Sequence, residues 1–309
     1  MDVNPAIIAA FGLGVGILVG MTGIGGGSLM TPLLILVVGT PPVTAVGTDL
    51  AYGAITKTVG GFKHWRQKTV DLKLSTWMAF GSVPAAIGGV IALEWLKENA
   101  GDDFEPILIS VLAGAILVTG IITLVRALFL KQLIARERET ITLARRSKTA
   151  AVLIGVVVGF MLGVTSAGSG ALIALALILA FRLVPQRVVG TDVFHAAILL
   201  WAAAAAHVVA GNVDYALAGT ILIGSIPGVW IGSHISVRVP AGTLRTVLGV
   251  VLVGAGLGLA SKAGAPIPPA VIAAVPLLLG VIVLGDRLRN RIPREEADTV
   301  TAADAAAAP

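Results

Sequence analysis

The chain has 309 residues, of which 56% are hydrophobic and only 13% are charged, and it contains no cysteine. Soluble domains carry about 25% charged residues. Here apolar stretches long enough to cross about 30 Å of hydrocarbon follow one another from residue 7 to residue 284. The composition predicts an integral membrane protein without a sizeable soluble domain, and it excludes disulfide frameworks, thiolate metal sites and cysteine catalysis.

The net charge of +5 is carried by short basic blocks between the apolar spans, with no interleaved aromatic residues. This pattern indicates cytoplasmic loops that obey the positive-inside rule, not a nucleic-acid-binding face. The two strongest blocks are 126–148 and 287–294. We therefore expect a multi-pass protein of the cytoplasmic (inner) membrane with a cytoplasmic C-terminus. The first apolar segment, 5–20, has no Lys or Arg before it, so we interpret it as a retained span and not a signal peptide.

The chain contains an internal duplication. At an offset of 143 residues, positions 12–89 match 155–232 without a gap, and roughly a third of the residues are identical. The matches include residue types that apolar composition alone would not align, namely His64 with His207, Asp71 with Asp214, and the Gly-Thr-Asp triplets at 47–49 and 190–192.

Each repeat opens with an apolar stretch that a glycine cluster interrupts, at 22–27 and at 165–170. Because glycine opens conformations that end a helix, each stretch is predicted to be a helical hairpin, whose arms are either short and re-entrant or fully spanning. The helices expected after the hairpins are 43–62, 74–96, 105–128, 186–209, 215–236, 242–261 and 267–285. The predicted divisions are a first repeat (1–128), a basic cytoplasmic linker (129–149), a second repeat (150–262), an extra transmembrane helix (263–286) and a disordered cytoplasmic tail (287–309).

Charge along the chain predicts the orientation of the two repeats. With the linker inside, the acidic loop 98–105 falls outside and the basic loop 63–73 falls inside. The two repeats then enter the membrane from opposite sides. The predicted fold is an all-α polytopic helix bundle of two inverted-topology repeats, each opening with a glycine-broken helical hairpin, an arrangement typical of secondary transporters.

The motifs resemble those of the TauE/SafE sulfite exporter family. The resemblance rests on Gly-Ile-Gly-Gly-Gly-Ser at 23–28, His-Trp-Arg at 64–66, Gly-Ser-Val-Pro at 81–84 and Gly-Ser-Ile-Pro-Gly at 224–228, and it covers about residues 12–258. It implies outward, ion-coupled transport of sulfite, a sulfonate or a related small organosulfur anion. One departure is that Asp49 and Asp192 stand where the family usually has serine after Gly-Thr, and a pair of carboxylates would repel an anion unless protonated or neutralised.

The glycine clusters and nearby hydroxyls are the predicted substrate site. Backbone N–H groups at the helix starts expected at Gly27 and Gly170 would favour an anion. The candidates are Gly25, Gly26, Gly27, Ser28, Thr48, Ser166, Gly168, Ser169, Gly170 and Thr191. The alternative is close helix packing through small residues, which we favour for Gly12, Gly16 and Gly20.

Charged residues inside the apolar spans are the predicted coupling site, since intramembrane carboxylates are costly and usually functional. Asp49 and Asp192 would bind a coupling proton or cation, with His195 three residues after Asp192 as a relay partner. The alternative for the aspartates is helix capping. Lys57 would either balance Asp49 or a substrate anion, or extend to the cytoplasmic interface. For His64 and His207, and for Asp71 and Asp214 seven residues after them, we favour interfacial turns and helix capping over a gate.

No His, Asp or Glu spacing suggests a bound metal, and the first glycine cluster lacks the lysine of a phosphate loop. The sequence thus predicts a protein that is not an enzyme and has no cofactor or metal. The expected partners are a small anion, the lipid bilayer and a coupling proton or cation, with a homo-oligomer left open and no nucleic acid. Alternatives to the exporter are an uptake permease or channel for a small anion, and a non-transport membrane assembly component.

Overall fold

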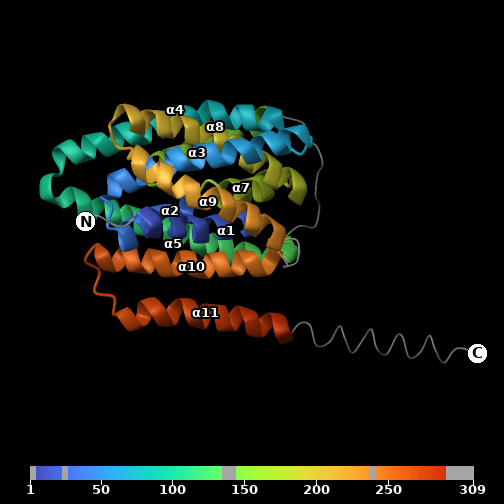
Figure 1. Ribbon diagram of the computed structural model, residues 1–309. Helices are drawn as coiled ribbons and strands as arrows, with labels where there is room; N and C mark the ends of the chain where they lie inside the picture. Colours follow the sequence, from blue (N-terminus) through green and yellow to red (C-terminus); the bar gives the residue numbers. More distant parts are fainter. Residues whose placement is uncertain (1–4, 23–26, 134–143, 237–240, 290–309) are drawn as a thin grey trace, which may run out of the picture.

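The computed structural model describes residues 5–22, 27–133, 144–236 and 241–289, and these are almost entirely helical. The helices run side by side in one bundle, with the last one at its edge (Figure 1). The helices are α1 (Pro5–Thr22), α2 (Gly27–Leu33), α3 (Pro42–Arg66), α4 (Leu72–Asn99), α5 (Phe104–Leu133), α6 (Arg145–Thr165), α7 (Leu172–Phe181), α8 (Pro185–Val209), α9 (Tyr215–Ser236), α10 (Ala241–Lys262) and α11 (Pro269–Arg289).

Six of the described helices are long and apolar enough to cross a membrane: α4, α5, α6, α8, α9 and α10. The second arms of the two hairpins are much shorter. α2 with the π-helical turn Leu34–Val38 has 12 residues in all, and α7 has 10 residues. At about 1.5 Å per residue these arms reach only about half of a 30 Å hydrocarbon layer. The described structure is therefore a polytopic helix bundle with two short, interrupted arms.

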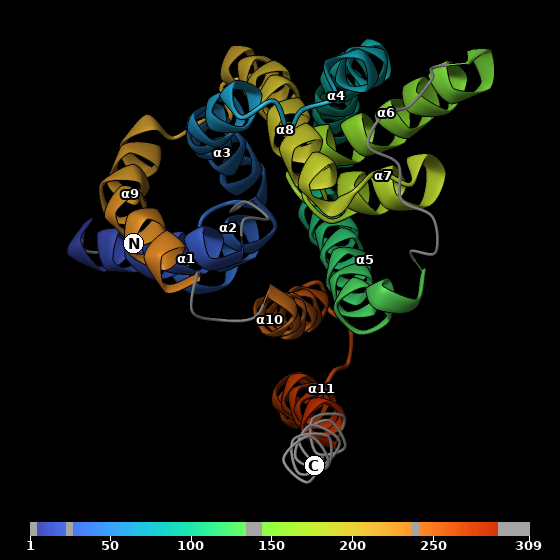
Figure 2. The same cartoon turned by 90° about the vertical axis from the view of Figure 1, so that its right-hand side faces the viewer.

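Helices of one repeat pack mainly on helices of the other repeat, and we call these pairs the exchanged pairs. α1 packs on α9 and α4 packs on α6, while α3 packs on α8 and α5 on α10. Viewed along the bundle, α1, α2, α3 and α9 gather on one side and α4, α6, α7 and α8 on the other (Figure 2). Each group thus combines three consecutive elements of one repeat with the fourth helix of the other. The contacts are reciprocal between the repeats, whereas their inverted orientation across a membrane stays a prediction.

Glycines allow the two helices of an exchanged pair to approach each other closely. A Cβ added at Gly12, Gly16 or Gly20 of α1 would collide with backbone carbonyls of α9, and one added at the matching glycines 155, 159 and 163 of α6 would collide with carbonyls of α4. The packing interpretation of the first three glycines is confirmed. Since a side chain at these positions would push the helices apart, the small-residue stripes hold each exchanged pair together.

Helix ends follow the expected local rules, with some shifts in boundaries. α3 and α8 begin at Pro42 and Pro185, where proline is pre-organised for a first turn. α5 and α6 extend into the predicted linker 129–149, since its lysine and arginine residues are compatible with helix. The predicted tail 287–309 falls outside the described residues from 290 onward, and 287–289 complete α11.

Candidate functional site

The second glycine cluster lies against the start of α2, the helix that follows the first cluster. The backbone N–H of Gly168 donates to Ser28 Oγ over 3.4 Å, which joins the second cluster to the start of α2. Ser28, Ser166 and Ser169 are all buried. Gly25 and Gly26 lie outside the described residues, and Gly27 is the first residue of α2, as expected.

The second cluster forms a turn between α6 and α7. Ser166 has a φ of 58° and Gly168 a φ of 98°, so the backbone leaves the helical region twice within three residues. For this reason α7 begins at Leu172 and not at Gly170, which corrects the predicted helix start. Gly170 instead stays in the turn that separates the two helices.

Asp49 lies at the centre of this polar region and is fully buried. Its Oδ2 accepts a hydrogen bond from Thr31 Oγ1 of α2 over 2.6 Å and another from Ser166 Oγ over 2.7 Å. Its Oδ1 has no hydrogen-bond partner among the described residues. Both donors are neutral hydroxyls, so one carboxylate joins the two hairpins and keeps one oxygen available for a proton or a cation. Thr31 was not among the predicted residues.

Asp192, the matching residue of the second repeat, has different surroundings. It is 4% exposed, and it lies within electrostatic range of Lys57 on α3 and Arg126 on α5. Its Oδ1 likewise has no hydrogen-bond partner in the described part of the chain. The two carboxylates are therefore not equivalent: hydroxyls surround Asp49, whereas cationic side chains lie near Asp192.

His195 contacts hydroxyls of α4. Ser82 Oγ lies 3.1 Å from Nε2 and Ser75 Oγ lies 3.4 Å from Nδ1, and the ring is fully buried. Both ring nitrogens are thus engaged by a neighbouring helix. A relay between His195 and Asp192 stays a prediction.

Thr48 and Thr191 hold helix starts in a reciprocal manner. Thr48 Oγ1 accepts the backbone N–H of Asp214 over 3.0 Å, and Thr191 Oγ1 accepts the backbone N–H of Asp71 over 2.9 Å. Asp71 and Asp214 in turn accept the N–H of Leu74 and of Leu217, as helix N-caps do. The capping interpretation of these two aspartates is confirmed. The threonines join each repeat to the other, and their predicted contact with a substrate stays a prediction.

Sequence reasoning missed Arg126, because it was grouped with the basic linker. The structure places it inside α5, seven residues before the end of that helix, and only 5% of it is exposed. Its Nη1 lies 3.3 Å from the carbonyl oxygen of Gly170 and 3.5 Å from that of Ala171. The signal that could have found it is an arginine that follows an unbroken apolar run without any helix-ending residue.

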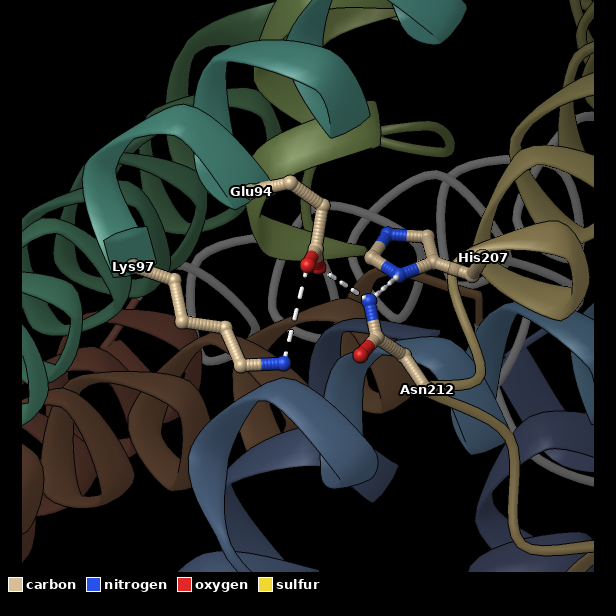
Figure 3. A network of polar contacts seen from close by, with 4 residues as sticks. All are labelled: Glu94, Lys97, His207 and Asn212. Atoms are coloured by element: carbon tan, nitrogen blue, oxygen red, sulfur yellow. Dashed lines mark hydrogen bonds and ion pairs between the residues drawn. The ribbon is translucent and has the colours of Figure 1, made fainter. Parts of the chain in front are cut away.

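His207 belongs to a polar network at one end of α8 (Figure 3). Its Nε2 donates to the carbonyl oxygen of Gly163 over 2.9 Å, and Asn212 Nδ2 lies 3.3 Å from its Nδ1. The same amide donates to Glu94 Oε1 over 2.6 Å, and Glu94 pairs with the exposed Lys97. The network ties α4, α6 and α8 together, which supports a structural role for His207.

A groove of about 730 Å³ lies between α4 and α8 beside this network. It is lined by apolar residues of the two helices, together with the carboxylates Glu94 and Glu98. An apolar lining with two acidic groups does not suit a small anion. The candidate anion site is therefore the polar region around the glycine clusters.

Comparison with known proteins gives matches that span most of the chain. The family described as Sulfite exporter TauE/SafE matches residues 8–259. The "Probable membrane transporter protein YjnA" of Bacillus subtilis (strain 168) is 42% identical over 252 residues, covering 82% of this chain and 98% of the relative. The "Probable membrane transporter protein YdhB" of the same organism is 27% identical over 242 residues, covering 78% and 94%. A "Probable membrane transporter protein" of Xylella fastidiosa is 25% identical over 264 residues, covering 82% and 94%. No solved structure matches the chain.

Proposed function

We propose that this chain, which belongs to the TauE/SafE sulfite exporter family, exports sulfite, a sulfonate or a related small organosulfur anion across the cytoplasmic membrane. Membership of this family makes the chain a multi-pass membrane transporter. The proposal adds the substrate class, the outward direction, coupling to a proton or cation, and alternating access by two inverted repeats.

The observation that carries the proposal is the bonding of Asp49. A buried carboxylate in an apolar bundle is costly and usually functional, and hydroxyls from both hairpins converge on this one. A proton or cation that binds to Asp49 changes the charge at the point where the two halves meet. Non-helical backbone at membrane depth is tolerated where it is buried in protein or lines a water-filled cavity, and short, interrupted helices in corresponding positions of two repeats are typical of transporter binding sites, which favours transport over a role in assembly.

The site also answers the objection that carboxylates repel anions. Asp192 has Lys57 and Arg126 within electrostatic range, so its charge is partly balanced. Asp49 would be neutral when protonated. An anion could then enter the polar region without facing two uncompensated negative charges.

The test is flux of radiolabelled sulfite and of methanesulfonate in proteoliposomes, with and without an imposed pH gradient. For Asp49→Asn we expect exchange to persist while gradient-driven accumulation is lost. Asp103→Asn replaces an exposed aspartate and serves as the matched control, which should behave like the unmodified protein. Gradient dependence that survives in Asp49→Asn would remove Asp49 from coupling. Flux that only follows the anion's own concentration gradient, and that an imposed pH gradient does not drive, would indicate a channel. No flux of either anion would contradict the substrate class.

A further inference from the structure

We propose that Arg126 is the residue that binds the negatively charged group of the substrate, an oxyanion such as sulfite or a sulfonate, beside the turn 166–171. This inference rests on the proposed function, because it names the recognition residue of the same site. Four observations carry it: the unsatisfied state of the guanidinium, the free amides of the turn, the polar face of α5, and the local balance of charge.

The guanidinium of Arg126 is buried without an anion in contact. Its two hydrogen bonds, to the carbonyls of Gly170 and Ala171, are long at 3.3 and 3.5 Å, and its Nε has no partner among the described residues. No carboxylate oxygen of the described chain lies within 4.0 Å of it. A buried charge is costly unless it is paired, so the side chain is in the state expected of a ligand-binding arginine before its anion arrives.

The adjoining turn contributes hydrogen-bond donors. The backbone N–H groups of Ser169, Gly170 and Ala171 make no hydrogen bond to any residue that the structure describes. All three residues are buried. They precede α7, whose N-terminal end adds a positive partial charge. Consecutive free amides in a turn form an anion-binding concavity, and here they lie in the same segment that Arg126 contacts.

The face of α5 that carries Arg126 is polar. Thr119 and Thr123 precede it by seven and three residues and are buried, and the position of a Cβ at Gly168 would lie 3.9 Å from Thr119 Oγ1. The hydroxyls of both threonines donate to carbonyls one turn earlier in α5. Their oxygens can in turn accept a hydrogen bond from a protonated oxyanion.

The charge around Arg126 is positive. Arg245 of α10 and Asp192 are within its electrostatic range, and Asp192 also has Lys57 within range. Arg126, Arg245 and Lys57 stand against Asp192 and, across the turn, Asp49, so one positive charge is in excess even when both carboxylates are ionised, which suits an anion. A guanidinium has a planar fork that matches two oxygens of one oxyanion, so the arginine selects sulfur oxyanions over a spherical halide.

The experiment measures the dissociation constant of sulfite and of methanesulfonate for the purified full chain by calorimetry. Arg126→Gln removes the charge but keeps amide donors for the Gly170 and Ala171 carbonyls. We expect about 10- to 100-fold weaker binding, as for the loss of a charged hydrogen bond. Arg126→Lys keeps the charge without the fork, and we expect intermediate binding. Arg187→Gln is the matched control, since Arg187 also donates to a backbone carbonyl, that of Val70 over 3.4 Å, at a partly exposed position.

Unchanged binding in folded Arg126→Gln would overturn the inference and leave Arg126 as a support for the turn. If that variant does not fold, unchanged binding in Arg126→Lys would overturn it equally. Absence of binding of both anions to the unmodified protein at millimolar concentration would also overturn it. Anions that bind through Arg126 but do not cross the membrane in the flux assay would contradict the proposed function and not this inference.

Discussion

Two adjacent glycines of α4 offer a sharp test of how the exchanged helices pack. A Cβ added at Gly89 would lie 2.6 Å from the carbonyl oxygen of Phe160, 3.3 Å from the amide nitrogen of Val164 and 3.4 Å from Gly163 Cα, all on α6. A Cβ added at Gly88 meets nothing within 4 Å. The variants Gly89→Ala and Gly88→Ala therefore make the same chemical change in the same helix with opposite steric results.

The expected magnitudes follow from these distances. Both variants gain the helix propensity of alanine over glycine, about 1 kcal/mol. In Gly89→Ala the new methyl falls about 1 Å short of an ordinary contact distance, and the obstacle is backbone, which cannot rotate away. Overpacking of this kind costs about 1–3 kcal/mol. Because the propensity gain cancels in the comparison, Gly89→Ala should be less stable than Gly88→Ala by about 1–3 kcal/mol.

The assay is thermal unfolding of both purified variants in the same detergent, followed by the flux measurement. Gly89→Ala should unfold at a lower temperature than the unmodified protein, whereas Gly88→Ala should unfold at the same temperature or higher. The clash also displaces the end of α6, one residue before Ser166, so the hydrogen bond to Asp49 should weaken and transport should fall in Gly89→Ala alone. Equal stability of the two variants would refute the close approach of α4 and α6.

Three further experiments with substituted proteins probe other parts of the structure. Asn212→Ala removes the amide of the network at the end of α8 and should cost about 1–3 kcal/mol of unfolding free energy, measured by thermal unfolding; an unchanged midpoint would contradict it. Gly168→Ala and Gly264→Ala both place alanine at a φ of 98°, but only Gly168 has a side chain, at 2.6 Å, in the way, so it should lower the unfolding midpoint more. Lys57→Met and Asp192→Asn should each destabilise the protein, and the double variant should lose less than the sum by about 0.5–3 kcal/mol; strict additivity would contradict their electrostatic coupling.

Much of the fold could be predicted from local sequence signals. Pro42 and Pro185 mark the starts of α3 and α8, and the N-cap residues Asp71 and Asp214 mark those of α4 and α9, so these four starts lie within two residues of their predicted positions. The break after α6 also followed, because the second glycine cluster lies in a turn between two helices, as its glycines predict. The positive φ values at Ser166 and Gly168 explain why the second cluster ends a helix and delays the next one.

The pairing of helices could not be predicted from the sequence, and neither could the site residues that depend on it. Glycine stripes indicate that a helix packs closely, but they do not say on which partner, so the exchange of α1 with α9 was not foreseen. The contacts of Thr48 and Thr191 could not be predicted for the same reason, since their hydroxyls bind helix starts of the opposite repeat. Arg126 was grouped with the basic linker because basic residues follow it in the sequence. It is nevertheless buried, because its side chain lies against a turn that is distant in the sequence.

The turn 166–171 connects the two charged parts of the site. Its first residue, Ser166, donates to Asp49, and the carbonyls of its last two residues, Gly170 and Ala171, contact Arg126. If an anion binds Arg126, it competes for the guanidinium with that carbonyl, and the released turn shifts the hydroxyl on Asp49. By linkage, protonation of Asp49 must then change the affinity for the anion by the same factor as the anion changes the affinity for the proton. Coupling through so short a segment needs only that the turn can adopt two conformations. The backbone can change conformation at its two positive-φ residues, which are flanked by free amides.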